Sequence, residues 1–350
     1  MVRNWRCSSP QPNQWLKGNV IGSGSFGTVH LAIDSATGAL FVAKTANSEA
    51  GITSLKNEAN ILENLNCPNI IKCIGKDFSL AEKQYSLFFE YMAGGSLSDL
   101  SQKFGGVLNE NLIRLYTREI LQGLKYLHNN GILHSDIKCK NVLLGSSGNV
   151  KLADFGCAKR LSDKKINTKN SSQYWNFIGG TPLWMAPEVL RNERLDFAAD
   201  IWSLGCTVIE MATGKSPWGG DDSNPTVIML EIAKGNEVPQ FPGNFSPEGL
   251  DFLAKCLERD YRKRWTSEKL LEHPFVTGQK ASNGNSRNDN ALSPTSVLDV
   301  ASYDSDSNEF VSRISFFTMK FCFQEKNLMP ENALEDHLEL SDNWITVRSS

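Results

Sequence analysis

Apolar positions recur at two different spacings along the chain. In residues 15–90 they mostly alternate with polar positions in short runs, which predicts strands, and only 54–65 has the spacing of a helix. In residues 91–276 they return every three or four residues, which predicts helices. The clearest helical face, in 112–127, consists of Leu112, Tyr116, Ile120, Leu124 and Leu127. The pattern therefore favours a strand-rich part with one helix, followed by a larger helical part.

The two ends of the chain lack this patterning. Residues 1–14 are polar and contain two Pro, which predicts a short flexible lead. From 277 the composition turns to Ser, Asn, Asp and Gly, so residues 277–350 are predicted to be a largely disordered tail. The run FVSRISFFTMKFCF at 310–323 is apolar again. Because Arg313 and Lys320 interrupt it, we interpret it as a docking segment for a partner and not as a membrane anchor; packing on the helical part is the alternative.

The composition excludes several classes of protein. A net charge of −3 and a pI of about 6.0 show no basic excess, so no nucleic-acid partner is expected. No stretch approaches the roughly 18 uncharged apolar residues of a membrane span, and the N-terminus lacks the apolar run of a signal peptide. The eight Cys are scattered without a C-x-x-C pair, which is typical of reduced thiols. We therefore expect a cytoplasmic location, with the nucleus as a second compartment.

A glycine-rich segment, GSGSFG at 22–27, has G-x-G-x-x-G spacing. The same spacing occurs in dinucleotide-binding folds, but there a helix follows. Here Val29, Leu31 and Ile33 alternate with other residues, which predicts a strand, and a second strand ends at Lys44. We therefore interpret the segment as a hairpin, and its glycines allow close approach of the backbone to a ligand. A strand–glycine loop–strand hairpin resembles the one with which protein kinases cover the phosphates of ATP.

Lys44 ends an apolar strand and can reach nucleotide phosphates from there. In the helix predicted at 54–65, Glu58 shares a face with Leu62, whereas Glu63 lies on the other side. Phe41-Val42-Ala43-Lys44 resembles the V-A-I-K strand of protein kinases, which implies that a Glu of the following helix fixes the position of the Lys, and the shared face selects Glu58 for this role. The alternatives, a solvated edge charge at Lys44 and an ordinary exposed Glu58, stay open from the sequence.

A dense cluster of polar residues follows the helix at 112–127. Residues 131–144 read GILHSDIKCKNVLL, which contains the pattern H-x-D-x-K-x-x-N. Asp154-Phe155-Gly156 comes soon afterwards. The tripeptide alone is common, but a chance match at this spacing after such a loop is very improbable.

Together these motifs resemble those of the eukaryotic protein kinases over about residues 15–276. The resemblance implies an α+β, bilobal protein kinase fold. Its N-lobe, about 15–90, would hold a small antiparallel sheet with one key helix, and its C-lobe, about 91–276, would be larger and mainly helical. The resemblance also implies ATP and Mg²⁺ as cofactors.

The resemblance implies a role for each motif residue. Asp136 would orient or accept the proton of the substrate hydroxyl, Lys138 would neutralise the γ-phosphate, and Lys44 would hold the α- and β-phosphates. Asn141 and Asp154 would bind Mg²⁺. The residues expected to contact ATP lie in the glycine loop, the strands after it, the following helix and the hinge: Ile21, Gly22, Ser23, Gly24, Ser25, Phe26, Gly27, Val29, Ala43, Lys44, Glu58, Phe89, Glu90 and Met92.

Other residues resemble family positions with structural roles. Glu188 in Ala-Pro-Glu would pair with Arg264, and Asp200 would hold the catalytic loop from below. Thr181 would bridge the catalytic Asp and Lys. His134 has no chemical role in this scheme and is expected to be a packed structural residue.

Finer similarities point to one branch of the family. Lys138 together with Gly180-Thr181-Pro182 resembles the serine/threonine branch. GTPLWMAPEVL, DFGCAKRL and ADIWSLGCTVIEMATGKSPW are similar to MEKK-type MAP kinase kinase kinases, and the H-S-D loop is similar to a plant subgroup. This implies an ATP-dependent serine/threonine protein kinase whose protein partner and substrate is a MAP kinase kinase. The alternative is a pseudokinase scaffold that binds ATP or partners without phosphoryl transfer.

Ser135 departs from the family pattern, which has Arg at this position. That Arg binds a phosphorylated residue of the activation segment and orders the segment. Ser135 has no guanidinium to offer a phosphate, whereas the residues for the chemistry are retained. We therefore expect altered regulation with intact chemistry. The segment still contains residues that could be phosphorylated: Thr168, Ser171, Ser172 and Tyr174.

Overall fold

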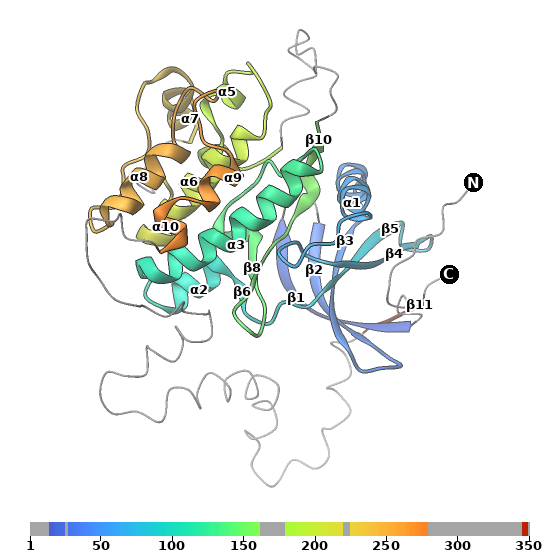
Figure 1. Ribbon diagram of the computed structural model, residues 1–350. Coiled ribbons are helices and arrows are strands. Elements are labelled where there is room, and N and C mark those ends of the chain that lie inside the picture. The colour runs from blue at the N-terminus through green and yellow to red at the C-terminus, as the bar shows by residue number, and fades with distance from the viewer. Residues whose placement is uncertain (1–13, 25–26, 162–178, 220–224, 279–344, 349–350) are drawn as a thin grey trace, which may run out of the picture.

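The computed structural model describes residues 14–24, 27–161, 179–219, 225–278 and 345–348. These residues form an antiparallel sheet with one helix packed on it and a larger, mainly helical part beside it (Figure 1). The two parts are the N-lobe and the C-lobe of the predicted α+β bilobal fold, which is thereby confirmed.

The N-lobe sheet places its described strands in the order β11-β1-β2-β3-β5-β4. Every neighbouring pair is antiparallel. The carboxylate of Asp34 accepts the N–H groups of Ala36 and Thr37 and so closes the turn between β2 and β3. The strands are β1 (Gln14–Gly24), β2 (Gly27–Asp34), β3 (Leu40–Ala46), β4 (Cys73–Ser79), β5 (Gln84–Glu90) and β11 (Ile345–Arg348).

The helix of the N-lobe is α1 (Glu49–Leu62), which confirms the helix predicted at 54–65. It begins earlier than predicted because the side chain of Ser48 accepts the N–H of Gly51 and caps the helix. The face that packs on the sheet buries Leu55, Glu58, Ala59 and Leu62, among others. A carboxylate on an apolar face requires a partner.

The C-lobe is built around two long helices, α3 (Glu110–Asn129) and α6 (Ala198–Thr213), which pack against each other. Four of the five apolar positions predicted for one face of α3 are buried, and Leu112 is half-buried. The other helices and short strands are α2 (Leu97–Lys103), α5 (Pro187–Leu190), α7 (Pro225–Lys234), α8 (Pro247–Cys256), α9 (Ser267–Leu271), α10 (Pro274–Thr277), β6 (Gly95–Ser96), β7 (Ile132–Leu133), β8 (Val142–Leu144), β9 (Val150–Leu152) and β10 (Lys159–Arg160), with 3₁₀ turns η1 (Cys139–Asn141), η2 (Phe155–Cys157) and η3 (Pro182–Trp184).

Two buried polar groups tie the C-lobe together as the sequence predicted. Arg264 forms a bidentate ion pair with Glu188 at 2.8 and 3.1 Å, and both side chains are fully buried. Asp200, in the first turn of α6, accepts the backbone N–H groups of His134 and Ser135, each at 2.9 Å. The loop that carries the catalytic motif therefore rests on a buried carboxylate.

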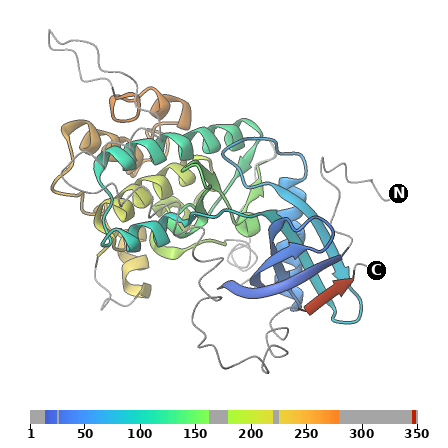
Figure 2. The same ribbon diagram turned by 90° about the horizontal axis from the view of Figure 1, so that it is seen from below.

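Strand β11 was not predicted. The sequence placed everything after residue 276 outside the folded lobes, yet residues 345–348 pair with the start of β1, and appear red beside the dark blue strand in Figure 2. A four-residue strand held by backbone pairing has too short a pattern to be found from apolar spacing. Of the lead predicted at 1–14, Gln14 is the first residue of β1 and residues 1–13 lie outside the described residues. The docking segment at 310–323 and the phosphorylatable residues at 168–174 also lie outside them. In the part of the chain that the structure describes, no helix is long and apolar enough to cross a membrane.

The buried ion pair predicts an asymmetric response to mutation. Glu188→Ala leaves the guanidinium of Arg264 buried without its counter-charge, so the free energy of unfolding should fall by about 3–5 kcal/mol. Glu193→Ala is the control, because Glu193 forms a partly exposed ion pair with Arg191 and should cost about 1 kcal/mol or less. Chemical denaturation measures both, and equal losses would contradict the role of the buried pair.

Candidate active site

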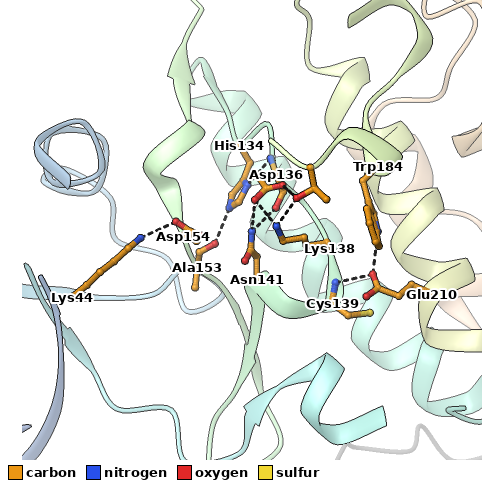
Figure 3. A network of polar contacts seen from close by, with 11 residues as sticks. Lys44, His134, Asp136, Lys138, Cys139, Asn141, Ala153, Asp154, Trp184 and Glu210 are labelled. Atoms are coloured by element: carbon orange, nitrogen blue, oxygen red, sulfur yellow. Dashed lines mark hydrogen bonds and ion pairs between the residues drawn. The ribbon is translucent and has the colours of Figure 1, made fainter. Parts of the chain in front are cut away.

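The ammonium group of Lys44 lies between two carboxylates that come from distant parts of the chain. Its Nζ lies 2.8 Å from Oε2 of Glu58 on α1 and 2.8 Å from Oδ1 of Asp154 (Figure 3 shows the second contact). Burial alone would lower the pKa of Lys44, but the charges of Glu58 and Asp154 outweigh it and raise this pKa above its ordinary value. The predicted choice of Glu58 over Glu63 agrees with this geometry.

The other oxygen of Glu58 joins α1 to the Asp-Phe-Gly segment. Oε1 accepts the backbone N–H of Phe155 at 2.9 Å. The neighbouring Asn57 donates from Nδ2 to the carbonyls of Gly156 and Ala158, at 3.3 and 3.0 Å. Asn57 was missed from the sequence, where only its position beside Glu58 could have drawn attention. The helix therefore fixes Lys44 and the segment that carries Asp154 together.

Asp154 and Asn141 present oxygen atoms suited to Mg²⁺. Burial would raise the pKa of Asp154, but the charge of Lys44 lowers it, so the side chain stays ionised. This side chain is still 37% exposed. Asn141 donates from Nδ2 to the carbonyl and to Oδ2 of Asp136, at 2.9 and 2.8 Å, which leaves its amide oxygen as the acceptor. Both are hard oxygen ligands, as Mg²⁺ prefers.

The donor set around these two residues is sparse. Within the described ranges, no group of three or more His, Cys, Asp or Glu side chains is placed to hold a metal. Mg²⁺ usually takes only one or two protein carboxylates and completes its shell with water and substrate phosphates. The residues present therefore fit a Mg²⁺–nucleotide complex better than a metal bound by the protein alone.

Asp136, Lys138 and Thr181 form a closed polar triangle. Figure 3 labels Asp136 and Lys138 of this triangle. Nζ of Lys138 lies 2.9 Å from Oδ2 of Asp136, and it also donates to the hydroxyl of Thr181. That hydroxyl donates to Oδ1 of Asp136 at 2.6 Å. The bridging position predicted for Thr181 is therefore observed. A charged donor, a carboxylate and a hydroxyl from two separate segments meet at one point.

His134 supports the loop from inside. It is fully buried, and its Nε2 lies 3.1 Å from the carbonyl of Ala153, next to Asp154. Its ring packs edge-on against Phe155, and the N–H of Asp136 approaches its Nδ1 at 3.3 Å. These contacts place His134 as the packed structural residue that the sequence predicted.

Ser135 forms a hydrogen bond with its backbone N–H, but among the described residues its side chain forms none. Its φ of +69° lies in the left-handed region, and its N–H bonds to Asp200. Its buried hydroxyl has no hydrogen-bond partner among the described residues. A small cavity beside it is also lined by Lys159 and Met185. Burial lowers the pKa of Lys159 to about 8, although the nearby Cys157 raises it in part.

The described residues of the glycine loop and the hinge lie on or next to strands of the N-lobe sheet. Gly27 has a φ of +150°, and a Cβ there would lie 2.4 Å from the carbonyl oxygen of Thr45, so only glycine fits. Ser25 and Phe26 lie outside the described residues. Phe89 is buried on β5 opposite Val42. The other described residues predicted to contact ATP lie on β1, β2, β3, α1 and β5, or in the case of Met92 just after β5.

The side chain of Glu90 bonds to other residues of the protein. Its Oε1 lies 2.7 Å from Nζ of Lys151 and accepts the N–H of Lys72 at 2.7 Å. Its own N–H bonds to the carbonyl of Lys72. The carboxylate is therefore committed to joining the hinge to β9, and a contact of Glu90 with adenine would use its backbone carbonyl.

A second carboxylate, Glu210 on α6, was also missed from the sequence. Its Oε2 accepts the N–H of Cys139 at 3.1 Å and the indole N–H of Trp184 at 3.0 Å (Figure 3). Burial raises its pKa, and these hydrogen bonds oppose the rise. Glu210 thus fastens the catalytic loop to the segment that carries Thr181. Nothing in the apolar pattern of α6 distinguishes it from a surface carboxylate.

Comparison with known proteins agrees with this geometry. The protein kinase domain model matches residues 15–276. The chain belongs to the protein kinase family.

Relatives of this kinase include several plant enzymes of one class. It is 37% identical to mitogen-activated protein kinase kinase kinase 2 of Arabidopsis thaliana over 336 residues, which are 91% of this chain and 50% of the relative. It is 36% identical to mitogen-activated protein kinase kinase kinase 18 of the same plant over 350 residues, which are 95% of this chain and 99% of the relative. The kinase spans half or less of the length of several relatives, among them mitogen-activated protein kinase kinase kinase 3 of the same plant.

The polar triangle predicts unequal effects of two neighbouring lysines. Lys138→Met removes a charged donor beside Asp136, so kcat of the kinase should fall about 100-fold, as when one preorganised charge-stabilising donor is lost. Lys140→Met is the matched control, because Lys140 is exposed in the same loop. Steady-state kinetics on one peptide substrate measures both. A similar loss in the two variants would contradict the role of Lys138.

Proposed function

We propose that this kinase is an active, ATP-dependent serine/threonine protein kinase that phosphorylates MAP kinase kinases in a MAP kinase cascade. The proposal rests on the contacts of Lys138 and Thr181 with Asp136, through which two separate segments of the chain meet at one carboxylate. The assembled pair of Lys44 and Glu58 supports it. The names of the relatives also support it, since they are MAP kinase kinase kinases.

In the proposed reaction the protein mainly positions groups and stabilises charge. Asp136, held by Lys138 and Thr181, orients the hydroxyl of a substrate Ser or Thr and receives its proton. Lys138 offers a fixed positive charge where the transferred group passes. Lys44, fixed by Glu58, orients the nucleotide from the other lobe. When bound between Asp154 and Asn141, Mg²⁺ would neutralise charge on the phosphates.

The pseudokinase alternative explains fewer of these features. A scaffold that only binds ATP needs no carboxylate held next to a lysine and a threonine at the opening of the site. The departure from the family at Ser135 concerns a side chain without hydrogen-bond partners among the described residues. It therefore leaves the contacts of Asp136, Lys138 and Asn141 intact.

The proposed activity is tested by incubating the purified chain with Mg²⁺ and labelled ATP. The substrates form a panel of MAP kinase kinases whose own catalytic lysine is mutated. Label should enter Ser or Thr of at least one of them, and Asp154→Asn should reduce the rate at least about 100-fold, in line with the usual size of such contributions. Nucleotide binding without transfer to any member of the panel would favour the scaffold.

Ser135 predicts that activity does not require phosphorylation of the activation segment. The Asp154 segment is already held by Asn57 and Glu58, through contacts that do not involve the side chain of Ser135. Phosphatase treatment of the kinase should therefore change its rate little, and Ser135→Arg should not raise basal activity. Peptide kinetics before and after treatment measures this.

A tenfold drop after dephosphorylation, which corresponds to about 1.4 kcal/mol in the barrier, would refute phosphate independence. Such a drop would mean that another positively charged side chain near Ser135 binds a phosphate of the activation segment. Lys159 and Arg160, on β10, are the two candidates.

A further inference from the structure

Residues 345–348 pair with the start of β1 and so cover what would otherwise be an edge of the N-lobe sheet. β1 pairs with β2 on one side, and on its other side residues 345–348 pair with residues 14–17. The register is Gln14 with Arg348, Trp15 with Val347, Leu16 with Thr346 and Lys17 with Ile345. Without β11, the start of β1 would be an edge strand with unpaired N–H and C=O groups.

The covered stretch supports the predicted nucleotide site. Trp15, in the middle of it, is 1% exposed and packs edge-on against Phe88 and Phe41, at ring distances of 5.3 and 5.9 Å. The same cluster contains Ala43, a predicted ATP contact. β1 then continues through an irregular stretch after Lys17 into the first glycines of the loop. The pairing with β11 thus acts on the strand that leads into the cover of the site.

We propose that residues 345–348 are an intramolecular latch: by pairing with β1 they hold the β1–β2 hairpin in place, and their release weakens nucleotide binding. The docking itself is independent of the proposed function, whereas the effect on ATP rests on it. The latch acts on the nucleotide cover and leaves Asp136, Lys138 and Thr181 untouched, since these lie in the other lobe.

The latch is reversible because the paired stretch is short. Four register pairs supply only a few backbone hydrogen bonds, and each one replaces hydrogen bonds to water. The covalent tether makes the docking an intramolecular event, for which effective concentrations reach the millimolar range when the tether spans the sites. Docking in the same molecule is therefore favoured over pairing with a second copy at ordinary protein concentrations.

The latch is tested by proline substitution in the full chain. Successive N–H groups of a strand alternate in direction, so Thr346→Pro together with Val347→Pro removes a donor of the ladder whichever way each one points. The matched control is Ser349→Pro together with Ser350→Pro, just beyond the strand. Hydrogen exchange of the amides at 14–17 and the Kd of a fluorescent ATP analogue are measured for the parent and both variants.

In the Thr346/Val347 variant the amides at 14–17 should exchange at least tenfold faster, with the Kd of the analogue raised several-fold and kcat at saturating ATP unchanged. The Ser349/Ser350 control should match the parent. Equal exchange at 14–17 in all three proteins would overturn docking, and an unchanged Kd despite faster exchange would overturn the coupling to nucleotide. Protection that appears only as the protein concentration rises would assign the edge to a second copy. Exchange is read without any phosphoryl transfer, so failure of the proposed activity leaves this test intact.

Discussion

The position of one ammonium group determines how the two lobes meet. Nζ of Lys44 lies 2.8 Å from carboxylates that belong to α1 and to the Asp-Phe-Gly segment. A charge so deeply buried is costly unless it is paired, and pairing it with two carboxylates restricts the geometry more than it stabilises the fold. Glu58 uses its second oxygen on Phe155, so the same carboxylate connects the lysine to the C-lobe. A strand, a helix and a loop are thus held in one arrangement by one small polar cluster.

The catalytic loop is held by a buried carboxylate of α6, Asp200, which bonds to its backbone. Its backbone enters the left-handed region at Ser135, where a non-glycine residue is strained. The carboxylate of Asp200 compensates by accepting two consecutive N–H groups there. Asp136 is consequently held where Nδ2 of Asn141 and the hydroxyl of Thr181 donate to its carboxylate. Glu210 accepts a third backbone N–H of the loop, that of Cys139. Buried carboxylates therefore satisfy backbone N–H groups of this loop, in which only the 3₁₀ turn η1 is regular.

Much of this arrangement could be predicted from the sequence, and the remainder could not, for physical reasons. The apolar period of α3 and the choice of Glu58 over Glu63 follow from which positions share a helix face, a local property. The predicted partners Glu188 and Arg264 follow from motifs in known order, and the structure brings them together. Asn57 and Glu210 act on backbone atoms of remote segments, and no local pattern marks a side chain that bonds to a distant carbonyl or N–H. The strand at 345–348 is recognised by the edge it meets, and its own four residues carry no sufficient signal.

The proposed latch and the proposed phosphate independence both place the point of regulation in the N-lobe. In an enzyme with Arg before the catalytic Asp, order in the activation segment comes from a phosphate bound to that Arg. Here the Asp154 segment is fastened to α1 by Asn57 and Glu58, so its position follows the position of the N-lobe. α1 in turn packs on the sheet whose edge strand is covered by β11. In the proposed latch, a change at that edge acts through β1 and the Trp15 cluster on Ala43 and the nucleotide cover. The proposed latch is compatible with a Ser at position 135, because a control point in the N-lobe sheet does not need a phosphate bound beside the catalytic Asp.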